Sequence, residues 1–138
     1  MCRFYTSFGK RAFDILASLI GLFCLLPVFF TIAIAVKVTS KGSIFYVQER
    51  LGKDFRPFKM LKFRSMVVND AQNHSLVTAK QDARITPLGS VLRAYKLDEL
   101  PQLINVLKGD MSLVGPRPEV ERYINHYKSD YEFILKIK

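Results

Sequence analysis

An uncharged apolar run from Ile15 to Val36 is the feature that most limits how this chain can fold. As one straight helix the run would be about 33 Å long, enough to cross a hydrocarbon core of about 30 Å. A chain of 138 residues offers too little surface to cover such a helix on every side, so a buried core helix is the least favoured interpretation. The run therefore predicts a helix in a membrane.

The flanks of the run bear on how this helix enters the membrane. Basic residues stand on both sides, at Lys10, Arg11, Lys37 and Lys41. Because both flanks are positive, the positive-inside rule gives no clear crossing. Pro27 lies near the middle of the run, where it removes a backbone hydrogen bond and bends a helix. A secretory signal peptide is disfavoured because its apolar run would be shorter than this one. The sequence favours a re-entrant helix with both ends on the cytoplasmic side, and a spanning helix remains the alternative.

The composition of the chain limits the classes of partner that it could bind. The net charge of +9 calls for a polyanion, which is nucleic acid, anionic lipid or a phosphorylated substrate. The length corresponds to at most one domain. Cys2 and Cys24 provide no disulfide framework, which suits a reducing cytosolic side, and His74 and His126 lie too far apart to suggest a zinc site.

Two short stretches after the apolar run have the composition of β-strands. Ser43 to Gln48 is rich in β-branched and aromatic residues, and Phe58 to Phe63 alternates apolar with basic side chains. Glu49 to Pro57 is expected to be the loop between them. Lys62 and Arg64 place positive charge along the second strand, either as a solvated face or as phosphate contacts.

A polar loop and a short helix are expected next. Residues 67–80 are polar and aperiodic, which is typical of a surface loop. Thr86 then suits the N-cap position and Pro87 the first turn of a helix, with Arg93 projecting from its polar side. One apolar face is predicted, made by Leu88, Val91, Leu92 and Tyr95.

The adjacent acids Asp98 and Glu99 are predicted to open a further helix that ends at Gly109. Its buried face is expected to hold Leu100, Leu103, Ile104 and Leu107. A helix N-terminus attracts phosphate and stabilises an ionised carboxylate, so an aspartate placed there can act as a nucleophile on phosphorus. Two adjacent acids also suit a hard divalent cation. The alternative is that Asp98 caps the helix and Glu99 decorates its first turn.

Arginines flank the acid pair and complete the elements of a phosphate site. Arg93 lies just upstream, and Arg117 stands in the stiff loop Gly115–Pro118. A guanidinium can bind phosphate oxygens through two parallel hydrogen bonds. Asp110, in the loop after the helix, is expected to be structural.

The stretch LDELPQLINVLKGDMSLVGPRPE, residues 97–119, resembles the hallmark of the bacterial sugar transferases. More narrowly, it is similar to the monotopic phosphoglycosyl transferases, which start glycan assembly on a polyprenyl phosphate. The resemblance continues upstream in FYVQERLG (45–52), FKMLKFRSM (58–66) and RITPLG (84–89), and so covers nearly the whole chain. A match of this length is far more specific than a short pattern.

The resemblance implies a particular chemistry. Asp98 would attack the β-phosphorus of a UDP-sugar, release UMP and carry the phosphosugar, which a polyprenyl phosphate in the membrane would then accept. Glu99, with Asp98, would hold Mg²⁺. The expected phosphate contacts are Arg93, Lys62, Arg64 and Arg117. The rivals are a non-catalytic basic module at the membrane, which composition alone supports, and an inactive remnant of the transferase.

The resemblance also implies an architecture. We expect an α/β fold, mostly helical with a short β-hairpin, in which 1–36 form the basic tail and re-entrant helix and 37–138 one compact cytoplasmic domain. Such helices often have a serine before the proline, where this chain has Leu26. The amphipathic segment 119–138 suits a membrane interface or the core, and family members continue beyond it, so the domain is expected to be incomplete. The location would be the bacterial inner membrane, without nucleic acid, and a homo-oligomer stays open.

Overall fold

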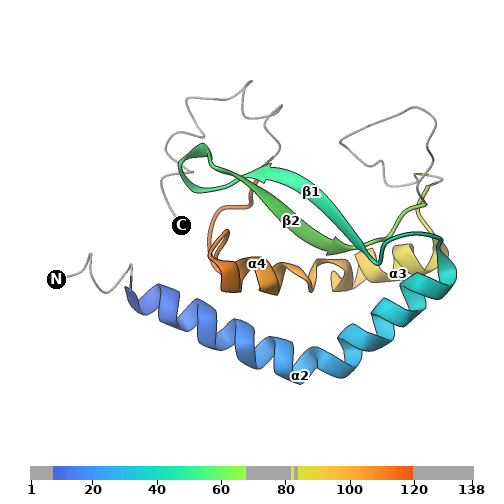
Figure 1. Ribbon diagram of the computed structural model, residues 1–138, viewed down its shortest axis with the longest axis horizontal. Helices are drawn as coiled ribbons and strands as arrows, with labels where there is room; N and C mark the ends of the chain where they lie inside the picture. The colour runs from blue at the N-terminus through green and yellow to red at the C-terminus, as the bar shows by residue number, and fades with distance from the viewer. Residues whose placement is uncertain (1–7, 68–81, 83, 120–138) are drawn as a thin grey trace.

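The computed structural model describes residues 8–67, 82 and 84–119 (Figure 1). In chain order the elements are α2 (Lys10–Thr39), β1 (Phe45–Leu51), η2 (Lys53–Phe55), β2 (Pro57–Phe63), α3 (Pro87–Ala94), η3 (Leu97–Glu99) and α4 (Gln102–Lys108), where η marks a 3₁₀ turn. The described part is therefore mixed helix with a two-stranded antiparallel sheet. Most of the predicted surface loop at 67–80 and nearly all of the amphipathic segment at 119–138 lie outside the described residues.

The predicted β-hairpin is confirmed, with a shorter loop than expected. β1 and β2 pair from Phe45↔Phe63 to Leu51↔Pro57, so β1 extends into the residues predicted to form the connection. The backbone N–H of Gly52 donates to the carbonyl of Arg56 at 2.9 Å and closes the turn. Residues directly opposite in such a pair share a face of the sheet. One face of the hairpin therefore carries Tyr46, Gln48, Arg50, Phe58, Met60 and Lys62.

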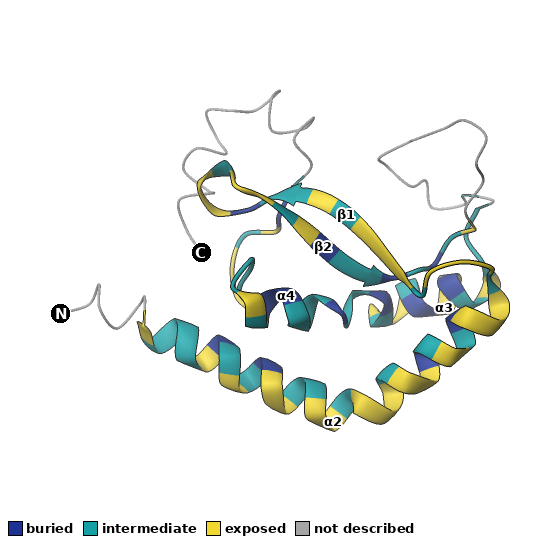
Figure 2. Ribbon diagram, viewed as in Figure 1, coloured by how far each residue is buried: buried dark blue, intermediate teal, exposed yellow. Residues whose placement is uncertain are grey.

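The predicted apolar helix is α2, which runs without interruption through Pro27. Figure 1 shows α2 as a long bent helix that curves beneath α3 and α4. Within the described part of the chain it is the one helix long and apolar enough to cross a membrane, judged by length and composition. Much of its surface is exposed (Figure 2), including large side chains such as Phe23 at 76% and Val38 at 81%. An apolar surface of this kind suits contact with lipid. The re-entrant path stays a prediction.

The C-terminal half of α2 contributes to the main apolar core. That core joins α2, β2 and α3 through Ile32, Val36, Phe63 and Leu92. The ring of Phe63 lies 4.7 Å from that of Phe29 and 5.5 Å from that of Phe45, measured between centroids. Offset aromatic contacts at such distances stabilise a core beyond the area they bury. The hairpin is thereby fixed to α2.

The N-terminal part of α2 is tied to α4 by charged side chains. Arg11 donates from its two terminal nitrogens to the carbonyls of Val106 and Leu107, at 2.6 and 2.7 Å. These carbonyls belong to the last turn of α4, where a cation satisfies orphan acceptors and the helix dipole. Asp14 is buried and accepts a hydrogen bond from the backbone N–H of Leu113 at 3.2 Å. The division at residue 36 into tail and domain stays a prediction.

Helix α3 starts as predicted, but its expected apolar face is only partly right. The Thr86 hydroxyl accepts from the Gly89 N–H at 2.9 Å, as an N-cap should. Leu92 is buried, whereas Val91 and Tyr95 are 51% and 73% exposed. The helix approaches the end of β2 through Gly89, where an added Cβ would lie 2.0 Å from the Ser65 carbonyl oxygen. This close backbone contact restricts burial to one narrow side of the eight-residue helix.

The second predicted helix begins later than expected. Asp98 and Glu99 form the 3₁₀ turn η3, and the α-helix itself starts at Gln102. Hydrogen bonds between residues three apart, from Glu99 to Lys96 and from Leu100 to Leu97, tighten this first turn into a 3₁₀ turn. Lys96 adopts a left-handed backbone conformation with φ of 60° and turns the chain between α3 and η3. Gly109 ends α4 at φ of 93°, as predicted.

The burial of α4 also differs from the prediction. Its buried residues are Asn105 and Val106, whereas the three leucines and one isoleucine that were predicted to be buried are only partly buried. Asn105 Oδ1 accepts from the Leu61 N–H at 3.0 Å, and its Nδ2 donates to the Lys59 carbonyl at 2.8 Å. The outer edge of β2 thus finds hydrogen-bond partners in a side chain of α4. Nδ2 also donates to Asp110 Oδ2 at 3.0 Å, in line with the structural role predicted for that acid.

Candidate active site

The acid pair lies on η3, between the hairpin and α4. Backbone hydrogen bonds from Glu99 to Lys96 and from Leu100 to Leu97 form this turn. Asp98 is buried, with 7% of its surface exposed, and the Glu99 side chain is 26% exposed. The two carboxylates therefore occupy different environments although they are adjacent in sequence.

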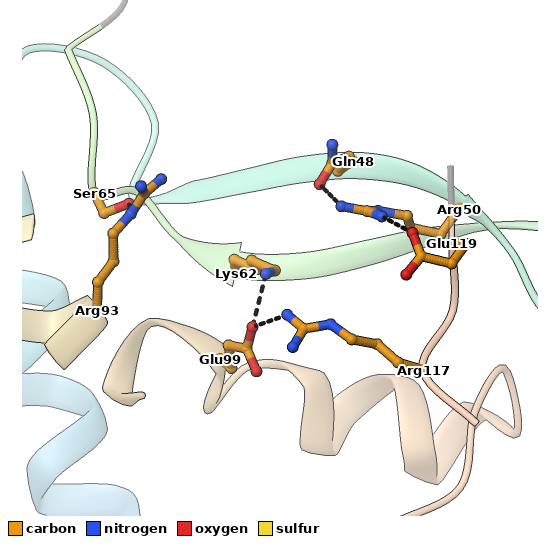
Figure 3. A network of polar contacts seen from close by, with 8 residues as sticks. All are labelled: Gln48, Arg50, Lys62, Ser65, Arg93, Glu99, Arg117 and Glu119. Carbon is orange, nitrogen blue, oxygen red and sulfur yellow. Dashed lines mark hydrogen bonds and ion pairs between the residues drawn. The ribbon is translucent and has the colours of Figure 1, made fainter. Parts of the chain in front are cut away.

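Glu99 joins three segments of the chain (Figure 3). Its Oε1 lies 2.9 Å from Lys62 Nζ, on β2, and 2.9 Å from Arg117 Nη2, in the loop after α4. Partial burial alone would raise the pKa of Glu99. The hydrogen bond from Lys62 and the nearby positive charges outweigh burial, so this pKa lies below its usual value and the carboxylate is ionised at neutral pH.

Asp98 has no such partner. Among the residues that the structure describes, its carboxylate makes no hydrogen bond or ion pair with another side chain. Burial raises the pKa of Asp98, Lys62 opposes that rise and the charge of Glu99 adds to it. Arg93 opposes the rise as well. A desolvated carboxylate near two cations can attack an electrophile whose negative charge those cations neutralise.

The other predicted phosphate contacts lie in two places. Arg93 Nε donates to the hydroxyl of the buried Ser65 at 2.8 Å, which fixes its guanidinium at the end of the network opposite Arg50 (Figure 3), and its charge acts on the pKa of Asp98, which burial raises. Arg64 Nη1 instead donates to the Lys41 carbonyl at 2.8 Å, in the segment between α2 and β1. The structure thus brings Lys62, Arg93 and Arg117 to the acid pair. A phosphate contact by Arg64 stays a prediction.

Sequence reasoning missed the contribution of β1. Arg50 Nη2 donates to Gln48 Oε1 at 2.9 Å, and Arg50 Nη1 lies 3.6 Å from Glu119 Oε2. Both β1 residues share the face of the hairpin that carries Lys62. The polar residues at positions 48 and 50 alternate along a strand, and this signal could have placed them beside Lys62.

The acid pair fits a magnesium ion that shares its ligands with a substrate. In the described ranges no three His, Cys, Asp or Glu side chains gather as a metal cluster. Mg²⁺ needs fewer, because it is usually bound through one or two carboxylates together with substrate phosphates and water. Asp98 and Glu99 provide this donor chemistry, and both cations that contact Glu99 do so at Oε1.

Known proteins resemble this chain along almost its entire length. A putative undecaprenyl-phosphate N-acetylgalactosaminyl 1-phosphate transferase of Bacillus subtilis is 42% identical over 88% of the chain. A UDP-N-acetylgalactosamine-undecaprenyl-phosphate N-acetylgalactosaminephosphotransferase of Aeromonas hydrophila is 40% identical over 94% of it. A UDP-glucose:undecaprenyl-phosphate glucose-1-phosphate transferase of Klebsiella pneumoniae is 45% identical over 87%.

The relatives differ in how much of them this chain represents. It spans 68% of the Bacillus protein, 30% of the Aeromonas protein and 26% of the Klebsiella protein. The matched part includes the acid pair, its cations and the apolar helix, since the family model described as bacterial sugar transferase covers residues 5–138. On this match the chain belongs to the bacterial sugar transferase family.

Proposed function

We propose that this chain transfers a sugar 1-phosphate from a UDP-sugar to a membrane polyprenyl phosphate, with Asp98 as the nucleophile. The observation that carries the proposal is the contrast between the two acids. Glu99 is held by Lys62 and Arg117, whereas Asp98 is buried and makes no side-chain hydrogen bond or ion pair in the described part of the chain. The names of the relatives, which refer to UDP-sugars and undecaprenyl phosphate, support this choice of donor and acceptor.

The reaction would proceed in two displacements at one phosphorus atom. A carboxylate oxygen of Asp98 attacks the β-phosphorus of the donor, and the bond to the bridging oxygen breaks, so that UMP leaves with the electron pair. The phosphosugar remains as an acyl phosphate on Asp98. An oxygen of the polyprenyl phosphate then attacks the same phosphorus, which frees Asp98 and yields a polyprenyl diphosphate sugar. Covalent catalysis of this kind divides one difficult transfer into two easier ones.

Positioning and charge would supply most of the rate. Lys62 and Arg93, whose charges both act on Asp98, would neutralise the transferring phosphate, while Arg117 would meet charge on the leaving side. Mg²⁺, held by Glu99 with Asp98, would screen the diphosphate as a Lewis acid. Glu99 keeps its negative charge for that ion because its pKa is held low, by Lys62 above all, despite partial burial.

The long helix would place this site at the membrane surface, on the cytoplasmic face of the inner membrane. We propose a re-entrant path, supported by basic residues at both ends and by the bend of α2 (Figure 1). Single cysteines at Ser7 and Ser40, introduced after Cys2→Ser and Cys24→Ala, test it with a membrane-impermeant maleimide. Both positions should label only after the cells are opened. Labelling from opposite sides would show a spanning helix.

Release of UMP tests the activity itself. The 138-residue chain, in detergent with polyprenyl phosphate, should release UMP from at least one of a panel of UDP-sugars, and a chelator should abolish the release. Asp98→Asn should reduce it by at least a thousandfold. Asp54→Asn is the matched control, because Asp54 is exposed and asparagine tolerates its left-handed backbone (φ 55°). Equal release by native chain and Asp98→Asn would exclude Asp98 as nucleophile.

A further inference from the structure

Arg50 is a partly buried cation that the mechanism above does not use. Its side chain is 16% exposed. Its Nε is buried without any hydrogen-bond partner among the described residues. The remaining contacts are the neutral Gln48 side chain and Glu119, which at 3.6 Å is too distant for a good hydrogen bond. The guanidinium thus lacks the dense hydrogen bonding that a purely structural buried arginine needs.

The surroundings of Arg50 call for an anion. Burial lowers the pKa of Arg50, Glu119 opposes that effect, and the positive charge of Arg117 adds to it. Two arginines that repel each other in a partly dehydrated site are stabilised when an anion binds between them. Because Arg117 also contacts Glu99, that anion would lie within the same polar network.

The position of Arg50 distinguishes the phosphates of the donor. In Figure 3, Arg93 and Arg50 stand at opposite ends of the network, with Lys62 and Glu99 between them. The charges that act on the pKa of Asp98, which burial raises, are those of Lys62, Glu99 and Arg93. Arg50 lies instead beside Glu119, at the end away from Arg93, and the charge of Arg117 acts on its pKa, which burial lowers. A group bound there would not be the phosphorus that Asp98 attacks.

We infer that Arg50, together with Arg117, binds the phosphate that leaves with the nucleoside monophosphate. The inference rests on the proposed function and extends it, since it assigns a donor-binding role to a β1 residue. Glu119 holds the guanidinium when no nucleotide is bound, and a phosphate bound to Nε and one terminal nitrogen would displace that weak contact. A guanidinium offers two parallel donors suited to such an oxyanion.

Direct binding of UMP, with uridine as the phosphate-free probe, tests this role without turnover. Arg50→Gln should weaken UMP binding about ten- to a hundredfold in calorimetry, and Arg50→Lys less, while uridine binding stays unchanged. Arg56→Gln is the matched control, because it removes the same charge from an exposed position on the same hairpin. Glu119→Gln removes the competing carboxylate and should tighten UMP binding.

The thermal unfolding midpoint separates this role from a structural one. Because Arg50 is partly buried and has poor hydrogen-bond partners, Arg50→Gln should leave the midpoint unchanged or raise it. A loss of UMP affinity together with a midpoint lowered by several degrees would assign Arg50 to the fold and overturn the inference. Equal UMP affinity in Arg50→Gln and Arg56→Gln, or no UMP binding by the native chain, would overturn it as well. If the native chain still released UMP from a UDP-sugar, the proposed function would survive that failure.

Discussion

Lys62 Nζ lies 2.9 Å from Glu99 Oε1, and this contact joins β2 to the turn that carries both acids. The two residues are 37 positions apart in the sequence. Burial raises the pKa of Asp98 and Lys62 opposes that rise. One lysine therefore lowers the pKa of Glu99 and limits the rise in the pKa of its neighbour Asp98.

Removal of the Lys62 charge should shift the pH dependence of the reaction. In Lys62→Met, Asp98 loses the larger of the two positive charges that oppose the effect of burial on its pKa, so the acidic limb of kcat/KM should move to higher pH. The rate at neutral pH should fall about a hundredfold or more. Lys59→Met is the control, since Lys59 is exposed on the same strand and faces the other side. If the acidic limb of the kcat/KM profile stays at the same pH in Lys62→Met, Lys62 does not act on the nucleophile.

The two acids should affect stability in opposite directions. The raised pKa of Asp98 means that its ionised form opposes folding at neutral pH, whereas the lowered pKa of Glu99 means that its ionised form favours folding. Without Mg²⁺, Asp98→Asn should raise the thermal unfolding midpoint and Glu99→Gln should lower it.

Lowering the pH should reduce the effects of both substitutions on the thermal unfolding midpoint. The stability from Glu99 is present above its unfolded-state pKa and is lost as the pH falls through its lower folded-state value. The penalty from Asp98 is present above its raised folded-state pKa and disappears as the pH falls through that value and then through the unfolded one. Midpoints measured from neutral to acidic pH in detergent check this. Midpoint shifts of the same sign in the two variants at neutral pH would contradict the opposite effects assigned to the two acids.

The left-handed backbone of Lys96 predicts a second stability difference. Asparagine tolerates φ of 60°, whereas a β-branched residue does not. Lys96→Val should therefore be less stable than Lys96→Asn by about 1–2 kcal/mol, although both lose the same charge. Because Lys96 precedes the turn that carries Asp98, Lys96→Val should also lose more activity. Equal unfolding free energies would mean that another conformation is accessible at this position.

The largest loss of stability is expected from a change to the buried amide of Asn105. In Asn105→Asp a carboxylate oxygen would face the Lys59 carbonyl and the Asp110 carboxylate, which now accept from Nδ2. The free energy of unfolding should fall by about 3 kcal/mol or more. Gln102→Glu makes the same amide-to-acid change at a partly exposed site of the same helix and should cost less than about 1 kcal/mol. Similar losses of unfolding free energy in the two variants would exclude the contact between Asn105 and the edge of β2.

The predictions from sequence succeeded where neighbouring residues decide the structure. Strand alternation located the hairpin, the Thr86–Pro87 pair located the start of α3, and Gly109 located the end of α4. Each of these signals acts within a few residues, through backbone sterics or a local hydrogen bond.

The predictions from sequence failed where contacts with distant segments decide the structure. The burial of Asn105 depends on the open edge of β2 more than 40 residues earlier. The docking of α2 through Arg11 and Asp14 likewise requires contacts with α4 and the loop after it, more than 90 residues away. No local pattern reveals such partners, because they are set by tertiary packing.

Covalent trapping of the nucleophile tests the central claim most directly. The chain is mixed with Mg²⁺ and the UDP-sugar that supports UMP release, without polyprenyl phosphate, and its intact mass and peptide masses are measured. One equivalent of UMP should appear in a burst, the chain should gain one phosphosugar on the peptide containing Asp98, and added polyprenyl phosphate should remove it. Turnover to lipid-linked sugar without any adduct on Asp98, or an adduct that persists in Asp98→Asn, would contradict the central claim.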